Sequence, residues 1–70
     1  MDFGKVSLEF RAKHSLTQVQ MAEILGVTNG MICNYEKGRF KPSKMKAIRF
    51  NYKMKEWEAN KNGGSLEKNS

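Results

Sequence analysis

The sequence predicts an all-α fold, a small bundle of about four helices in which the last helix is long. Apolar residues recur at intervals of three and four positions along most of the chain, which is the spacing of a helix face. Residues that start or stop helices separate these runs, among them Thr17, Gly26 and Gly38. A chain of 70 residues with 39% apolar content can form one domain with a modest core, expected over residues 1–59.

The first helix is expected over residues 3–14. Its apolar face consists of Phe3, Val6 and Phe10. The second helix is expected to begin after Thr17, which can form a capping box with Gln20, and to end at Gly26. Near its middle, Ala22 is small enough to let another helix cross at close range.

The third helix is expected to begin after its cap Thr28 and to close at Gly38. Ile32 and Tyr35 face inward, whereas the outer face carries short or polar side chains. The residues of that outer face are Asn29, Gly30, Cys33, Asn34 and Lys37. An asparagine amide donates and accepts at the same time, so this face carries groups suited to reading base edges in a DNA groove.

The fourth helix is expected from about residue 43 to 59, because Pro42-Ser43 favours a fresh helix start. It carries two apolar stripes, one of Met45, Ile48 and Tyr52 and the other of Ala47, Phe50, Met54 and Trp57. Two stripes exceed what so small a core needs, so either both pack inside or one faces a partner. The candidate dimer or partner face consists of Phe50, Met54 and Trp57. Residues 60–70 show no apolar period, and a disordered tail is expected there.

The basic residues are concentrated in and after the third helix. The net charge is +6, and the segment from residue 37 to 55 holds eight basic residues and no acid. Such a cluster is typical of a surface that binds nucleic acid or another acidic partner, although a solvated basic face has the same composition. Lys44 and Lys46 lie in the first turn of the fourth helix, where a phosphate would relieve their conflict with the helix dipole.

Several function classes are not expected. His14 has no Cys, Asp or His at ligand spacing, so the sequence predicts no metal site. The chain has one Asp, one His and no nucleophile with an adjacent base, so neither an enzyme nor a cofactor is expected. The single cysteine, Cys33, excludes an internal disulfide and fits a reducing, cytoplasmic location. No apolar run reaches the length of a membrane span.

Residues 11–43, about half of the chain, resemble the helix-turn-helix of the phage Cro and repressor family, the XRE type. The resemblance is carried by Arg11, Leu16-Thr17-Gln18, Ala22, Leu25-Gly26-Val27-Thr28, Ile32, Tyr35-Glu36, Gly38 and Pro42-Ser43. It implies a helix-turn-helix bundle with a positioning helix over residues 17–25 and a recognition helix over residues 28–37. It also implies a transcriptional regulator that binds double-stranded operator DNA as a homodimer.

The resemblance assigns roles to single residues. The positions that face bases or adjacent phosphates in the family are Thr28, Asn29, Gly30 and Asn34, and these residues are expected to contact bases. Gln18 is expected to bond a phosphate at the start of the positioning helix, and Arg11 and Glu36 are expected to form a structural ion pair. The motif and the charge pattern together favour a clamp that binds the phosphates of the DNA backbone. The alternative is that these side chains are only solvated. The clamp residues are Lys37, Arg39, Lys41, Lys44 and Lys46.

Three functions are consistent with these observations. The leading one is a sequence-specific, dimeric repressor of phage or mobile-element type. The second is an antirepressor or another protein-binding module on the same scaffold, which Gly30 and the surplus apolar face favour. The third is a sequence-tolerant nucleic-acid binder that acts through charge alone.

Overall fold

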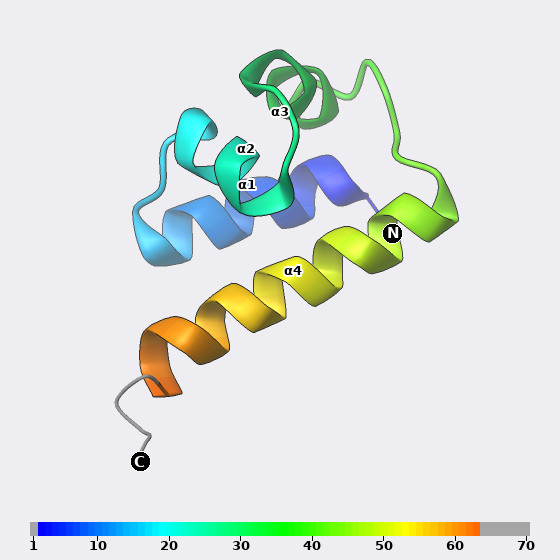
Figure 1. Cartoon of the computed structure of the whole chain (residues 1–70). Helices are drawn as coiled ribbons and strands as arrows, with labels where there is room; N and C mark the ends of the chain where they lie inside the picture. Colours follow the sequence, from blue (N-terminus) through cyan, green and yellow to red (C-terminus); the bar gives the residue numbers. More distant parts are fainter. Residues whose placement is uncertain (1, 64–70) are drawn as a thin grey trace.

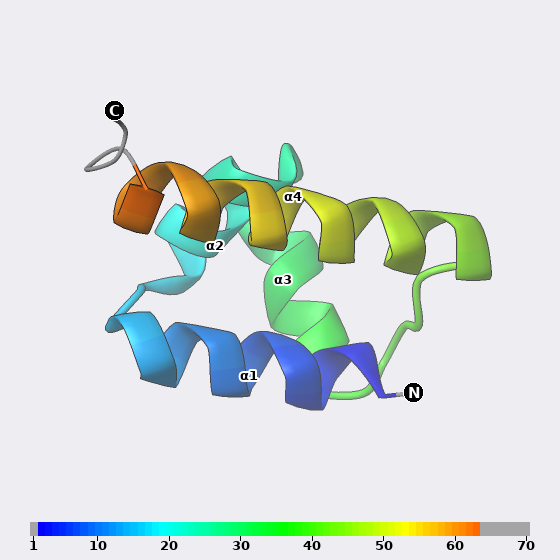
Figure 2. The same cartoon turned by 90° about the horizontal axis from the view of Figure 1, so that it is seen from below.

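The computed structural model describes residues 2–63, which form four α-helices and no strand (Figure 1). They are α1 (Phe3–His14), α2 (Gln18–Leu25), α3 (Asn29–Glu36) and α4 (Lys44–Gly63). Helices α1 and α4 run in the same direction, and α2 and α3 pack across them (Figures 1 and 2). The predicted all-α fold with a long last helix is confirmed.

The ends of the first three helices follow from their capping residues. Thr17 and Gln20 form the expected capping box: the Gln20 backbone N–H donates to Thr17 Oγ1 at 3.1 Å, and the Thr17 N–H donates to Gln20 Oε1 at 2.9 Å. Gly26 ends α2 at φ 72°, a left-handed conformation that glycine adopts without steric cost. Ser15 ends α1 at φ 56°, where a side chain is strained.

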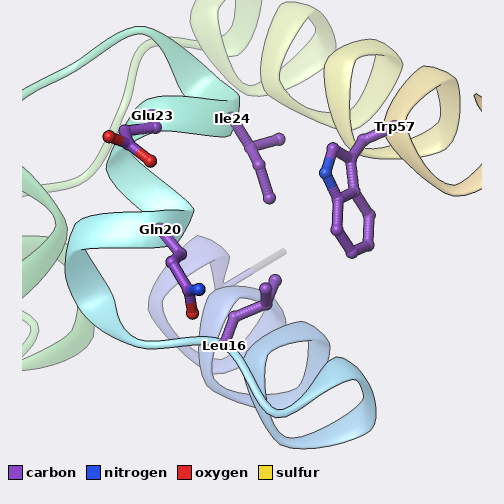
Figure 3. Close-up of a pocket in the computed structure, with 5 residues that line it drawn as sticks. All are labelled: Leu16, Gln20, Glu23, Ile24 and Trp57. Atoms are coloured by element: carbon purple, nitrogen blue, oxygen red, sulfur yellow. The ribbon is translucent and has the colours of Figure 1, made fainter. Parts of the chain in front are cut away.

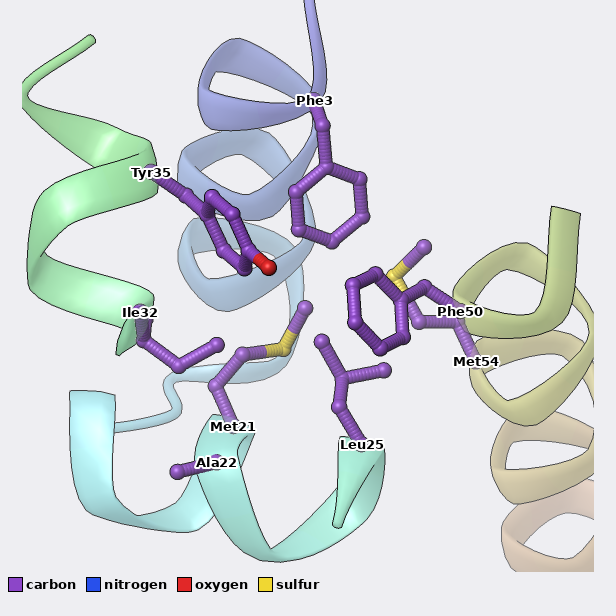
Figure 4. Packing of buried hydrophobic residues seen from close by; sticks show 8 residues of the cluster. All are labelled: Phe3, Met21, Ala22, Leu25, Ile32, Tyr35, Phe50 and Met54. Atoms are coloured by element: carbon purple, nitrogen blue, oxygen red, sulfur yellow. The ribbon is translucent and has the colours of Figure 1, made fainter. Parts of the chain in front are cut away.

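The core lies where all four helices meet (Figure 4). Its buried apolar residues are Phe3, Met21, Ala22, Leu25, Ile32, Tyr35, Phe50 and Met54. The Phe3 ring contacts Tyr35 edge-on at 5.5 Å between centroids and Phe50 at 5.1 Å, so one side chain of α1 joins α3 to α4. The expected small residue, Ala22, is 4% exposed at the crossing of α2 with α3.

Gly4 brings α1 and α3 into backbone contact. A Cβ at this position would overlap the carbonyl oxygen of Tyr35 and lie 3.2 Å from Glu36 Cα, so no larger residue fits. This contact was not predicted, although the sequence contains a pattern that points to it. Gly4, Ser7 and Arg11 are spaced three and four positions apart, which places two small residues and an arginine on one helix face.

The expected partner face on α4 is wrong. Phe50 and Met54 are buried in the core, and the half-buried Trp57 ring lies 5.8 Å from Phe10 and 5.0 Å from His14. This stripe faces α1 and α2, whose apolar side chains it covers. The exposed stripe of α4 is instead that of Met45, Ile48 and Tyr52.

Helix α4 is also longer than expected. It continues to Gly63 rather than ending near residue 59, so the expected domain 1–59 excludes part of a continuous helix. The remaining residues of the expected tail, 64–70, lie outside the described residues. Across residues 2–63, none of the helices combines the length and apolar character needed to cross a bilayer.

Candidate nucleic-acid interface

The interface begins at the N-terminus of α3, which lies at the surface. Thr28, Asn29 and Gly30 are exposed there, while Ile32 and Tyr35 of the same helix point into the core (Figure 4). Thr28 Oγ1 accepts the Met31 backbone N–H at 3.2 Å, which caps the helix and leaves the hydroxyl hydrogen to donate elsewhere. A Cβ at Gly30 would have its nearest neighbour, Thr28 Oγ1, at 3.9 Å. The absent side chain is therefore not required by the fold.

Asn34, the fourth expected base contact, is half-buried and touches Arg39. The Arg39 backbone N–H donates to the Asn34 carbonyl at 2.9 Å, and Arg39 Nη1 approaches Asn34 Oδ1 at 3.5 Å. With its side-chain oxygen facing Arg39, the Asn34 amide has its NH₂ group left to donate. The structure thus brings one expected base contact and one expected phosphate contact together.

A carboxylate under α3 fixes the orientation of this helix. The ion pair that the resemblance implies is present, with Arg11 Nη1 2.6 Å from Glu36 Oε1. Ser7 Oγ donates to Glu36 Oε2 at 2.7 Å, and Gln18 Nε2 donates to Glu36 Oε1 at 3.1 Å. The Glu36 side chain is only 5% exposed, so a single carboxylate joins α1, α2 and α3 inside the protein.

Two of these donors change the sequence-based interpretation. Ser7, which is fully buried on the apolar face of α1, was not among the predicted functional or structural residues. Gln18 was expected to bond a phosphate, but one of its amide hydrogens is used by Glu36. Its second amide hydrogen remains, as do the backbone N–H groups that begin α2. The phosphate contact of Gln18 therefore stays a prediction.

A basic groove lies between α3 and the start of α4. It has a volume of about 500 Å³ and includes the exposed cations Arg39, Lys41 and Lys46 in its lining, together with Tyr35 and Phe40. Lys37 and Lys44 are exposed but lie outside that lining. The structure thus gathers three of the five predicted clamp residues around one hollow.

The start of α4 is capped by a side chain. Ser43 Oγ accepts the Lys46 backbone N–H at 3.2 Å, as the Pro42-Ser43 pattern predicts. The first backbone N–H groups of α4 have no partner within a helix, and they point toward the end that carries Lys44 and Lys46. A phosphate in the basic groove would meet this positive end of the helix.

The other surface hollows offer no comparable set of groups. A hollow of about 380 Å³ between α2 and α4 is lined by Leu16, Gln20, Glu23, Ile24 and Trp57 (Figure 3). Its polar groups are the Gln20 amide, the Glu23 carboxylate and the indole N–H of Trp57, and its lining includes no cation. Among residues 2–63, no group of three His, Cys, Asp or Glu side chains lies close enough to hold a metal ion.

His14 belongs to a small polar cluster at the end of α1. Its Nε2 lies 2.6 Å from Glu58 Oε2, and Lys13 Nζ lies 3.2 Å from the same oxygen. The hydrogen bonds from His14 and then Lys13 lower the pKa of the Glu58 carboxyl below its ordinary value. This cluster joins α1 to α4 away from the basic groove.

Comparison with known proteins agrees with this geometry. A family model described as helix-turn-helix matches residues 8–50, which contain α2, α3 and the turn between them. No curated protein and no solved structure gives a significant match to the chain. The matched segment covers more than half of the 70 residues and includes every expected DNA contact. The chain belongs to the XRE-type helix-turn-helix family of DNA-binding regulators.

Proposed function

We propose that this protein regulates transcription by inserting α3 into the major groove of a double-stranded operator. The observation that carries the proposal is the placement of exposed short polar residues at the start of α3 beside a groove lined by Arg39, Lys41 and Lys46. The Glu36 carboxylate holds α3 to both preceding helices, so the reading surface is fixed before DNA binds.

Asn29 and Asn34 are the proposed base readers. An asparagine amide pairs best with adenine, whose N6 donates and whose N7 accepts in the major groove. Thr28 and Gly30 lie at the same end of α3, where a missing side chain allows close approach to a base or to the sugar-phosphate backbone. The clamp cations then bind phosphates and set the register of the helix in the groove.

The deciding experiment is selection of DNA from a random double-stranded pool by the purified protein, followed by binding measurements on the enriched sequence. Asn29→Ala should weaken binding about 5- to 150-fold, since a bidentate base contact contributes roughly 1–3 kcal/mol. Asn34→Ala should weaken binding less, because the Asn34 side-chain oxygen faces Arg39 and its NH₂ group is left to donate. Each should also relax the preference at one base position. Absence of any enriched sequence would contradict specific readout.

The clamp is tested by the salt dependence of binding. Lys41→Gln with Lys46→Gln should weaken binding to all sequences alike and lower the slope of log affinity against log salt by about 2. Lys61→Gln serves as the matched control, because Lys61 lies at the opposite end of α4 over the Trp57 ring. An equal change of slope in the control would remove the groove lysines from the interface.

More specifically, we propose that the protein is a cytoplasmic repressor of phage or mobile-element type. Two chains would bind one palindromic operator. Two recognition helices would then lie about one DNA turn, roughly 34 Å, apart. The seam expected for this dimer is buried in the core, so pairing needs another surface or the DNA itself. Enriched palindromes and two chains per site in sedimentation would support it, whereas a single half-site bound by one chain would contradict it.

Another candidate function is sequence-tolerant binding of nucleic acid. Gly30 favours this function because a glycine supplies no side chain to read bases at the start of α3. Gly30→Ala separates the two candidates. It should stabilise the helix by about 0.5–1 kcal/mol, since the site has room for a methyl group. If α3 enters the major groove closely, Gly30→Ala should bind double-stranded DNA more weakly than the wild type, whereas the DNA affinity of a charge-only binder should be unaffected.

A further inference from the structure

The outer side of α4 carries an apolar ridge that the DNA interface does not use. It consists of Met45, Ile48 and Tyr52, which are 71%, 56% and 66% exposed. They are spaced three and then four positions apart, so they form one line along the helix. None of them lines the basic groove. Large apolar side chains grouped in this way are typical of a binding surface.

A groove runs beside this α4 ridge. It has a volume of about 430 Å³ and is lined by Pro42, Lys44, Ala47, Ile48 and Asn51. Three of these residues are apolar, and Ile48 forms the edge shared by the groove and the ridge. The ridge thus offers both a convex row of side chains and an adjacent hollow for a partner's side chain.

The ridge is flanked by cations on both sides. Arg49 lies four positions after Met45 and three before Tyr52, while Lys55 lies three positions after Tyr52 and seven after Ile48. Both side chains are exposed, and neither forms an ion pair in the described part of the chain. Three carboxylates lie near these cations: Glu56 lies four positions after Tyr52, and Glu9 and Glu58 line a hollow together with Lys55.

A second copy of this chain does not match the ridge. Two ridges facing each other about a two-fold axis would bring Arg49, which lies near the middle of the ridge, close to Arg49 of the other chain, in a protein with net charge +6. Three partly exposed side chains also supply only a few hundred Å², below the roughly 800 Å² that each partner buries in a standard complex. Charge and area therefore favour a small partner of opposite charge.

We propose that the α4 ridge binds an acidic amphipathic helix of another protein. The apolar side of that helix would cover Met45, Ile48 and Tyr52, and its flanking carboxylates would pair with Arg49 and Lys55. Met45 and Tyr52 are seven positions apart, which corresponds to about 10 Å along α4, so a partner helix of about three turns is long enough to cover the ridge. The hollow beside the ridge shares Pro42 with the basic groove and includes Lys44, a predicted phosphate contact. Met45, Ile48 and Tyr52 themselves lie outside the basic groove, so a partner confined to the ridge leaves that groove open to DNA.

Two synthetic helical peptides provide the probe. Both carry the same leucine seam over three turns, but one has glutamates beside the seam and the other has lysines. The acidic peptide should shift the amide resonances of residues 44–56 in the ¹⁵N-labelled protein and bind at least 10-fold more tightly than the lysine peptide. Raising the salt concentration should narrow that difference, because the flanking pairs are exposed.

Variants then assign the binding to the ridge. Ile48→Gln with Tyr52→Gln should weaken binding of the acidic peptide at least 10-fold, and Arg49→Glu with Lys55→Glu should reverse the preference between the peptides. All four residues are exposed, so circular dichroism should show unchanged helix content. Leu8→Gln, at an exposed apolar residue of α1, is the matched control and should leave the affinity for both peptides unchanged.

Four outcomes would overturn the proposal. The first is equal binding of both peptides, and the second is binding of neither at millimolar concentration. The third is a concentration-dependent dimer whose resonance shifts fall on the ridge, which would make a second copy the occupant. The fourth is tighter binding to phosphatidylglycerol vesicles than to the acidic peptide, which would make the ridge a lipid contact.

Discussion

Removing the Glu36 carboxylate should destabilise the protein strongly, because three donors from two other helices depend on it. In Glu36→Ala, the hydroxyl of Ser7 loses its acceptor in a fully buried position. Arg11 loses the ion pair but is 22% exposed, and its Nε still donates to the Leu16 carbonyl at 3.1 Å. Gln18 loses one hydrogen bond near the surface.

The magnitude follows from these three environments. An unsatisfied buried hydroxyl costs roughly 1–3 kcal/mol, whereas Arg11 can turn its charged end to water and adds about 1 kcal/mol. The free energy of unfolding should therefore fall by about 2–4 kcal/mol, from a total of roughly 4–10 kcal/mol for a chain of this length. The melting temperature should fall by roughly 10–30 °C. Glu36→Gln keeps the shape and one acceptor, so its loss should be about half as large.

Urea unfolding followed by circular dichroism measures the change, with Glu23→Ala, an exposed glutamate of α2, as the control. The control should stay within about 0.5 kcal/mol of the wild type. Adding Ser7→Ala to Glu36→Ala should recover about 1 kcal/mol, because the orphaned hydroxyl is removed. A Glu36→Ala protein as stable as the control would refute the reasoning that this carboxylate joins the helices.

Three other substitutions test separate features. Gly4→Ala should lower the free energy of unfolding by roughly 1–3 kcal/mol or more in thermal melts, because its methyl group would overlap the backbone of α3. Ser15→Gly should raise it by about 1 kcal/mol, since the left-handed conformation at φ 56° strains a side chain but not glycine. Glu58→Gln should lower the melting temperature at pH 7 and have no effect in acid. The hydrogen bond from His14 lowers the pKa of Glu58. The Glu58 charge therefore contributes to stability above the ordinary glutamate pKa of 4.5, and this contribution disappears as the pH falls through the lowered pKa.

Each of these expectations has a contrary result. A Gly4→Ala protein with wild-type melting would mean that α1 and α3 are further apart than the structure shows. A destabilised Ser15→Gly protein would mean that the serine side chain makes a contact that outweighs its strain. A Glu58→Gln difference that persists unchanged down to pH 2 would show that charge on Glu58 contributes nothing to the fold.

The local features of the fold were predictable because each depends on residues that are close together in the sequence. The limits of α1, the capping box of Thr17 and Gln20, and the turn at Gly26 depend on residues within four positions of each other. The Arg11–Glu36 ion pair spans two helices, and only the family resemblance pointed to it. Periodicity alone does not pair residues on different helices.

The features that were missed depend on how helices sit against one another. Both stripes of α4 have the same helical spacing, so the pattern did not decide which would be buried; the choice of Phe50, Met54 and Trp57 as the outer face was wrong. Gly4 shows its role only once the backbone of α3 is beside it. The position of Lys37 and Lys44 outside the groove that Arg39, Lys41 and Lys46 line likewise depends on the path of the chain between α3 and α4.

The ring contacts between α1 and α4 have a consequence for the order in which the molecule folds. Phe3 pairs with Phe50 and Phe10 with Trp57, the same separation of 47 positions in both cases. The contacts of α2 with α3 are local and close short loops, whereas docking α4 on α1 closes nearly the whole chain and should come late. During synthesis, a nascent chain that already contains all of α3 has Tyr35 to pack against Phe3, but it still lacks Phe50 beside Phe3 and Trp57 beside Phe10. The frame around the recognition helix should therefore be complete only after Trp57 has been added.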